Sequence, residues 1–429
     1  MTATHRIPGL ILTDYEFQVP IDYTQPDGAR LPVFARAAVV MDKTQAELPW
    51  LVFFQGGPGF GSPRPNDTRS PGWLGRAAKE YRVLLLDQRG TGRSTPISYQ
   101  SLARFQSPQE QADYLKLFRA DNIVRDAEWI RREMKIDRWS VLGQSFGGFC
   151  VTTYLSIAPE GLREAFITGG LPPIHHHPDD VYRATYPRVR EKNRLYFERY
   201  PDDTQRVRGI VDHLMQHDVR LPCGDPLTPQ RFQQLGMSFG MSDGFEPVHY
   251  LLEEAFADGA YGKEISYTFL RGVENAQRFD TSPIYAILHE PCYCEGAAGN
   301  WSAERLRAEF PEFAVTADRP MLFTGEMVYP WMLDEYRTLR PLKEAAQVLA
   351  QFDCWPHLYD REALQRNTVP TAAALYYNDM YVDRLLSEET ASIIKGIHVW
   401  ATSEYEHNGL RADGEKILGR LLGLVRGEI

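Results

Sequence analysis

The sequence predicts an α/β fold in which a mostly parallel central sheet, flanked by helices, is interrupted by a large helical insertion. Residues 51–54 and 83–86 are continuous apolar runs that stop at loops containing Gly or Asp, as expected of strands buried on both faces of a parallel sheet. Residues 121–134 space their apolar side chains as an amphipathic helix does, and they lead into a third apolar run at 139–142. Residues 171–360 carry no such strand pattern.

The first third of the chain predicts antiparallel strands followed by βαβ units. Residues 10–40 alternate short apolar segments with turn residues, which indicates antiparallel strands that open the fold. Residues 143–148 predict a turn into a helix that ends at Ala158, before Pro159, and residues 165–168 predict a further strand.

Strand character returns after the insertion. Residues 371–377 and 397–401 predict strands, whereas the insertion itself is rich in Arg, Glu and aromatic residues at helical spacing. The chain closes with a helix whose apolar residues share one face: Ile417, Leu418, Leu421, Leu424 and Val425. We therefore expect one sheet-based core, built from residues 1–170 and 361–429, and a helical cap domain at 171–360.

Composition and charge narrow the class of protein. The chain has 429 residues, of which 43% are hydrophobic, and a formal net charge of -10. That apolar content suits a large core. A nucleic-acid or anionic-membrane binder would concentrate Lys and Arg on one face, so the net negative charge disfavours both kinds of binder. No apolar segment is long enough for a signal peptide or a membrane span. We expect a soluble cytoplasmic protein with neither nucleic acid nor membrane as partner.

The cysteines predict no metal site. Five are present, an odd number, and their only close spacing is Cys292-Tyr293-Cys294. Without a second ligand cluster this spacing does not make a zinc site, so reduced structural thiols are expected.

Residues 143–147 predict a nucleophile. They read Gly-Gln-Ser-Phe-Gly and lie between a predicted buried strand and a predicted helix. A tight turn there needs glycines beside Ser145 so that the strained backbone can project the hydroxyl. Serine also requires a base that takes its proton and an acid that orients that base.

The base and the acid are expected late in the chain, in the order acid then histidine. His407 follows the last predicted strand in a polar loop, so we predict it as the base. His398 lies inside that strand and is expected to be a packed residue. Asp379 and Asp383 both follow the strand at 371–377; Asp379, nearer the strand end, is the favoured acid, with Asp383 as the alternative or a helix cap.

An oxyanion also needs backbone N–H donors. Residues 55–59, Gln-Gly-Gly-Pro-Gly, directly follow a predicted strand, and their glycines permit a close backbone approach. The N–H groups of Gly57 and Phe146 are the predicted donor pair. A phosphate-binding role is disfavoured because the loop lacks the Gly-Lys-Ser/Thr of a P-loop.

These motifs resemble the proline iminopeptidase (prolyl aminopeptidase) family of α/β-hydrolases, in its longer bacterial branch. The family has His-Gly-Gly-Pro-Gly, Asp-Gln-Arg-Gly-x-Gly-x-Ser and Gly-x-Ser-x-Gly loops in that order. This sequence has matching loops at 55–59, 87–94 and 143–147, with Asp379 and His407 where the remaining catalytic groups are expected. Gln55 departs from the family's histidine but leaves the backbone donors intact.

The resemblance implies an α/β-hydrolase fold and a serine exopeptidase that removes N-terminal proline from small peptides without a cofactor. Such enzymes read the free amino group with acidic side chains of the cap. By that resemblance Glu290 and Glu326 are expected to be the substrate ligands. The alternatives are an esterase or amidase that uses the same three catalytic residues on an uncharged acyl group, and a non-catalytic binding protein of the same fold.

Overall fold

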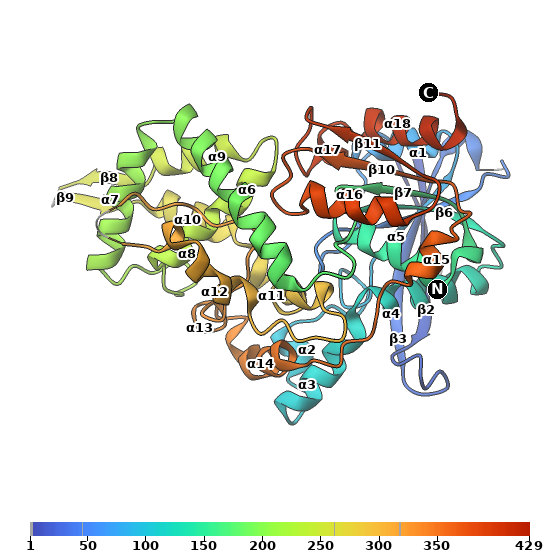
Figure 1. Cartoon of the computed structure of the whole chain (residues 1–429), viewed down its shortest axis with the longest axis horizontal. Coiled ribbons are helices and arrows are strands. Elements are labelled where there is room, and N and C mark those ends of the chain that lie inside the picture. Colours follow the sequence, from blue (N-terminus) through green and yellow to red (C-terminus); the bar gives the residue numbers. More distant parts are fainter. Residues whose placement is uncertain (1–2, 45, 261, 317–318) are drawn as a thin grey trace.

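The computed structural model describes residues 3–44, 46–260, 262–316 and 319–429, and it is built on one large sheet (Figure 1). The strand order is β1-β2-β3-β5-β4-β6-β7-β10-β11, with antiparallel pairing from β1 to β5 and parallel pairing from β5 to β11. The strands are β1 (Ala3–Ile7), β2 (Leu10–Pro20), β3 (Arg30–Val40), β4 (Trp50–Phe54), β5 (Arg82–Leu86), β6 (Trp139–Gln144), β7 (Leu162–Thr168), β10 (Thr371–Tyr376) and β11 (Ile397–Thr402).

The central strands are apolar throughout because both faces of the sheet are covered. β4 sends Val52 and Phe54 into one apolar cluster and Leu51 and Phe53 into another. The first cluster packs under α4 (Ala120–Glu133) and α5 (Phe146–Ile157), and the second under α1 (Gly72–Ala78) and α18 (Gly414–Arg426). The mostly parallel sheet flanked by helices that the sequence predicts is therefore confirmed.

β11 behaves differently because it is an edge strand. Residues on this strand are mostly exposed or half-buried, and His398 is exposed. The expectation that His398 is packed was wrong, since a strand with a neighbour on one side only leaves part of its length open to solvent.

Between β7 and β10 the chain forms a helical lobe beside the sheet (Figure 1). Its helices are α6 (Pro178–Arg199), α7 (Asp203–Gln216), α8 (Pro229–Gln233), α9 (Phe245–Glu253), α10 (Tyr267–Ala276), α11 (Pro283–Ile287), α12 (Ser302–Leu306), α13 (Met332–Glu335) and α14 (Lys343–Gln351). A short antiparallel hairpin, β8 (Phe256–Gly259) with β9 (Gly262–Ile265), was not expected in this region. Both strands are largely exposed, so they lack the apolar pattern of buried strands.

The remaining short helices belong to the segments before and after the lobe. They are α2 (Tyr99–Leu102), α3 (Pro108–Leu115), α15 (Arg361–Gln365), α16 (Arg384–Ile393) and α17 (Gly409–Ala412). α14 packs beside α3, so the far end of the insertion touches a helix that precedes it by more than two hundred residues (Figure 1). The lobe and the sheet share one apolar cluster, which surrounds the site described next.

Candidate active site

Ser145 stands at a strained turn between β6 and α5. Its backbone has φ 54° and ψ -127°, a conformation that non-glycine residues rarely adopt. The turn packs tightly on its neighbours: a Cβ atom added to Gly147 would lie 2.0 Å from the carbonyl oxygen of Phe54. Only glycine therefore fits beside the serine at this point.

His407 and Asp379 come together at the same edge of the sheet. Asp379 follows β10 and His407 follows β11, and the two parallel strands end side by side. His407 Nδ1 lies 2.6 Å from Asp379 Oδ2. The other carboxylate oxygen of Asp379 accepts the backbone N–H groups of Tyr381 at 2.8 Å and Val382 at 3.1 Å. Asp379 is therefore held firmly, with one oxygen directed at the imidazole.

The segment after β7 connects this pair with Ser145. The backbone N–H of Ser145 donates to the carbonyl oxygen of Thr168 at 3.0 Å. A Cβ atom added to Gly170 would lie 2.2 Å from the Ser145 carbonyl oxygen, and one added to Gly169 would lie 3.3 Å from His407 Nδ1. Two consecutive glycines thus touch the serine and the histidine, so the structure brings both predicted residues to one place.

The charges around His407 favour its protonated form. Burial alone would lower the pKa of His407, but the carboxylate of Asp379, with smaller contributions from Glu326 and Glu406, outweighs burial and raises it. Neutral imidazole is the form that can accept the serine proton, and it is lost as pH falls through this raised pKa.

We therefore expect the acid limb of kcat/KM to lie above pH 6.5, because an ordinary histidine titrates at about 6.5 and the pKa of His407 is raised. The measurement is kcat/KM against pH with an aryl ester that carries no amine, so that no substrate group titrates in the range. An acid limb below pH 6 would contradict a raised pKa of His407. Replacing Glu326 by Gln removes one of the negative charges and should move the limb towards lower pH.

Asp383 has a different role. Its Oδ1 accepts the N–H groups of Leu385 at 2.8 Å and Leu386 at 3.3 Å, which caps α16. Its other oxygen lies 2.9 Å from Nε of Arg188, on α6 of the helical lobe. The alternative acid is therefore occupied in joining the sheet to the lobe.

The loop at 55–59 lies against the serine turn. A Cβ atom added to Gly56 would lie 2.9 Å from the Cβ of Ser145. Gly57 follows with φ 135°, and Phe146 is the first residue of α5, where helical N–H groups have no partner within the helix. These are the two predicted donors. The carbonyl of Gln55 accepts Nε2 of Gln88 at 3.0 Å, so the loop is fixed through its backbone.

Glu326 belongs to the same site. Its side chain is 14% exposed and contacts the hydroxyl of Tyr285 and Nε2 of His289, the latter 3.3 Å from Oε2. Burial alone would raise the pKa of Glu326, but the nearby His289 and the Tyr285 hydroxyl outweigh burial and lower it. The side chain is thus an ionised carboxylate, and its charge is felt by His407.

Glu290 does not lie beside Glu326 in this site. The residue is 5% exposed, and its carboxylate receives the backbone N–H groups of Ser302 and Ala303 at the start of α12. Burial raises its pKa, and these N–H groups offset only part of that. The expected pair of substrate carboxylates is therefore split. His289 and Glu290 are adjacent, yet His289 contacts Glu326 whereas Glu290 supports the loop before α12.

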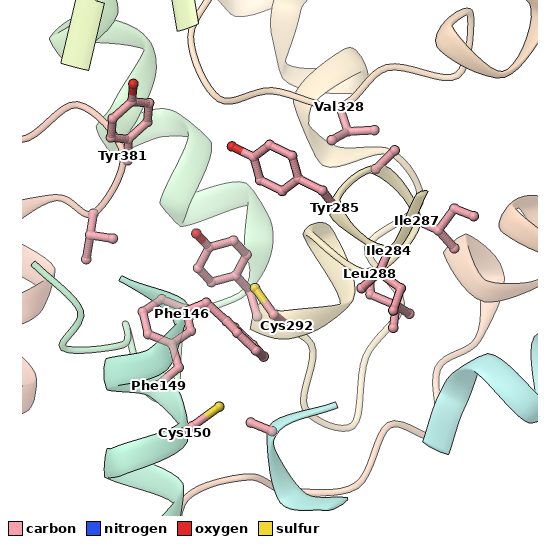
Figure 2. Close-up of a cluster of buried hydrophobic side chains, with 14 of the residues drawn as sticks. Phe146, Phe149, Cys150, Ile284, Tyr285, Ile287, Leu288, Cys292, Val328 and Tyr381 are labelled. Atoms are coloured by element: carbon pink, nitrogen blue, oxygen red, sulfur yellow. The ribbon is translucent and has the colours of Figure 1, made fainter. Parts of the chain in front are cut away.

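Aromatic side chains that the sequence did not single out complete the site. The ring of Tyr381 lies 4.7 Å from that of His407, and Tyr285 packs 5.0 Å from Phe60 of the loop after Gly59. Figure 2 shows Tyr285 of α11 above Phe146 and Phe149 of α5, with Cys292, from the turn after α11, beside Phe146. The only signal for these residues was their position beside the Glu290 motif and after β10.

Among the residues that the structure describes, no three His, Cys, Asp or Glu side chains cluster as ligands for a metal ion. Within the same ranges, none of the helices has the length and apolar character that crossing a bilayer requires.

Comparison with known proteins agrees with this geometry. A family model described as alpha/beta hydrolase fold matches residues 49–236. Esterase E22 has a solved structure that covers 96% of this chain and all of its own, with a TM-score of 0.50 and 11% identity, a likeness of fold only.

Sequence relatives match over nearly the whole chain. A proline iminopeptidase of Aeromonas sobria is 50% identical over 422 residues, which is 98% of this chain and 98% of that protein. Proline iminopeptidase aneH of Aspergillus aculeatus is 36% identical over 99% of this chain and 96% of its own length. Both alignments include the helical lobe as well as the sheet.

Proposed function

Because this chain belongs to the proline iminopeptidase family of α/β-hydrolases, we propose that it releases N-terminal proline from small peptides, with Ser145, His407 and Asp379 as its catalytic residues. The chain is a serine hydrolase. Two relatives named proline iminopeptidase match it over almost their full length. The contact of His407 with Asp379 and the strained turn at Ser145 support these roles.

In the acylation step, His407 Nε2 takes the hydroxyl proton of Ser145 while Oγ attacks the carbonyl carbon of the N-terminal proline. The carbonyl oxygen becomes an oxyanion, which the N–H groups of Gly57 and Phe146 stabilise. The protonated His407 then gives its proton to the departing peptide amine as the C–N bond breaks. Asp379 holds the imidazole by Nδ1 and stabilises its charged form.

In the deacylation step, His407 takes a proton from water, and the hydroxide oxygen attacks the prolyl ester on Ser145. The second oxyanion collapses, the ester C–O bond breaks and His407 returns the proton to Oγ. Free proline leaves and the enzyme is restored.

The observation that carries the exopeptidase proposal is Glu326. A protonated proline amine in a closed pocket needs a charge partner, because an unpaired buried ion costs several kcal/mol. Glu326 supplies an ionised carboxylate next to the aromatic wall of Tyr285, and close enough to His407 to influence its pKa. A simple acyl ester has no charge for this carboxylate to meet.

We further propose that residues 171–360 act as a cap domain that limits substrates to short peptides, amides or aryl amides. The support comes from the contacts of the lobe at the site: Glu326, Tyr285 and His289 all come from it, and the Tyr381 hydroxyl donates to the carbonyl of Met237. We also propose a cytoplasmic location, which is supported by the five unpaired cysteines.

The test of the exopeptidase proposal is a comparison of proline arylamide with its N-acetyl derivative and with a simple acyl ester. Glu326→Gln should raise KM for the free-amine arylamide about tenfold to a hundredfold, because it removes a charge-assisted hydrogen bond. N-acetylation should abolish turnover by the wild type, while hydrolysis of the ester by Glu326→Gln changes little. Each protein is assayed on the pH plateau of its own kcat/KM profile with the ester, so that the protonation state of His407 is matched.

Glu290→Gln is the matched control, because its carboxylate contacts α12 rather than the site. It should leave KM for proline arylamide within about threefold of the wild type. If the wild type releases no arylamine from proline arylamide yet hydrolyses the ester rapidly, the exopeptidase proposal is wrong and an esterase of the same fold is left.

A further inference from the structure

Two buried side chains extend from Glu326 into the helical lobe. His289 is 3% exposed, with Nε2 3.3 Å from Glu326 Oε2 and Nδ1 3.4 Å from the hydroxyl of Tyr182 on α6. Tyr182 is itself buried. On the other side of Glu326, the hydroxyl of Tyr285 donates to Oε1. The four side chains thus form one chain of polar contacts inside the apolar cluster.

The chemistry of the groups sets the direction of the hydrogens. An ionised carboxylate only accepts, so the hydrogen between His289 and Glu326 must be on Nε2. The other ring nitrogen, Nδ1, lies 3.4 Å from the hydroxyl of Tyr182, so the ring of His289 is held at both nitrogens. Tyr182 therefore holds the ring of His289 in the orientation that points Nε2 at Glu326.

From this arrangement we propose that His289, held by Tyr182, is a positioning residue for the substrate amine: it fixes the rotamer of Glu326. This inference rests on the proposed aminopeptidase function. Among the residues that the structure describes, each oxygen of Glu326 contacts one donor, which leaves its remaining lone pairs to the substrate.

The two donors approach Glu326 from elements that are themselves anchored. Tyr285 is held against the loop at 55–59: a Cβ atom added to Gly59 would lie 2.9 Å from its backbone nitrogen. His289 follows α11, and its ring lies 5.7 Å from that of Tyr293, which in turn contacts Phe149 of α5 at 5.6 Å. The position of Glu326, the proposed ligand of the substrate amine, is thereby tied to the elements that carry the oxyanion donors and the nucleophile.

The test compares His289→Leu, His289→Gln and Tyr182→Phe in the full-length protein. Each variant is assayed with proline arylamide and with an aryl acetate, and prolinol serves as a competitive inhibitor to measure amine binding. Leucine removes the donor at nearly the same volume, while the amide of glutamine can replace the Nε2–H. Tyr186→Phe is the control, since Tyr186 is a buried residue of the same helix whose hydroxyl contacts Ala303 and Tyr329 instead.

We expect His289→Leu to raise KM for proline arylamide and the inhibition constant of prolinol about tenfold or more, with kcat for the aryl acetate within about threefold. Tyr182→Phe should have a smaller effect in the same direction. His289→Gln should restore amine binding to within about threefold of the wild type, and Tyr186→Phe should leave it unchanged. A purely structural role would lower hydrolysis of both substrates together and would not be rescued by glutamine.

Unchanged amine binding in His289→Leu, or equal loss with both substrates in His289→Leu and Tyr182→Phe, would overturn the inference. If His289→Leu does not fold, unchanged prolinol binding in Tyr182→Phe would overturn it just as well. Failure of the proposed function is separate, because then the wild type itself would not turn over proline arylamide.

Discussion

Ser145→Ala is expected to lower kcat for proline arylamide by about 10⁴- to 10⁶-fold, the range typical for loss of a serine nucleophile. Without Oγ no acyl-enzyme forms, and only water attack assisted by the oxyanion donors is left. The change removes one oxygen atom and keeps the Cβ, so the strained backbone at φ 54° is not altered. The measurement is steady-state release of arylamine, with thermal unfolding to show that the fold persists.

Ser156→Ala provides the matched control for this loss. Ser156 is a buried serine of α5, the helix that follows Ser145, and its hydroxyl donates to the carbonyl of Thr152 at 3.0 Å. Its replacement should leave kcat within about threefold of the wild type. Retention of more than a tenth of the activity by Ser145→Ala would contradict the assignment of the nucleophile.

Asp379→Asn is expected to lower kcat by about 10⁴-fold, as loss of the orienting acid does in serine hydrolases. The carboxylate accepts Nδ1–H of His407 across 2.6 Å, so it selects the tautomer with a free Nε2. An asparagine amide can donate to Nδ1 instead, which places the imidazole hydrogen on Nε2 and blocks proton transfer from Ser145. The asparagine oxygen can still accept the N–H groups of Tyr381 and Val382, so local folding should survive.

Asp383→Asn separates the two candidate acids. Asparagine still caps a helix, so the expected change is loss of the contact with Arg188 and a decrease of about 1 kcal/mol in the free energy of unfolding. Activity should stay within about threefold of the wild type. The assignment is refuted if Asp383→Asn loses activity by orders of magnitude while Asp379→Asn keeps it. Denaturant unfolding measures the stability change.

Much of the fold could be predicted because the signals are local. The continuous apolar runs of β4, β5 and β6 and the helical spacing of α4 can be recognised from the order of side chains along each short segment. The predictions failed where the environment decides: His398 is exposed because β11 is an edge strand, and the hairpin of β8 and β9 is too short and too polar to show a pattern.

Ser145, His407 and Asp379 could also be predicted from local sequence signals, because each follows a strand of a parallel sheet. Such strands end at one edge, so residues far apart in sequence meet there by topology alone. The sequence by itself therefore determined the class of fold, the catalytic candidates and their order. It left Asp379 and Asp383 as alternatives, which only their hydrogen-bond partners distinguish.

The placement of Glu290 and Glu326 was decided by tertiary structure alone. Glu290 and Glu326 look equivalent in the sequence, yet the first supports α12 and the second meets Tyr285 and His289. The reason is that short helices joined by irregular turns carry no period that predicts which side chain faces inward. Their orientation follows from packing against the sheet and from the need of each buried carboxylate for hydrogen-bond donors.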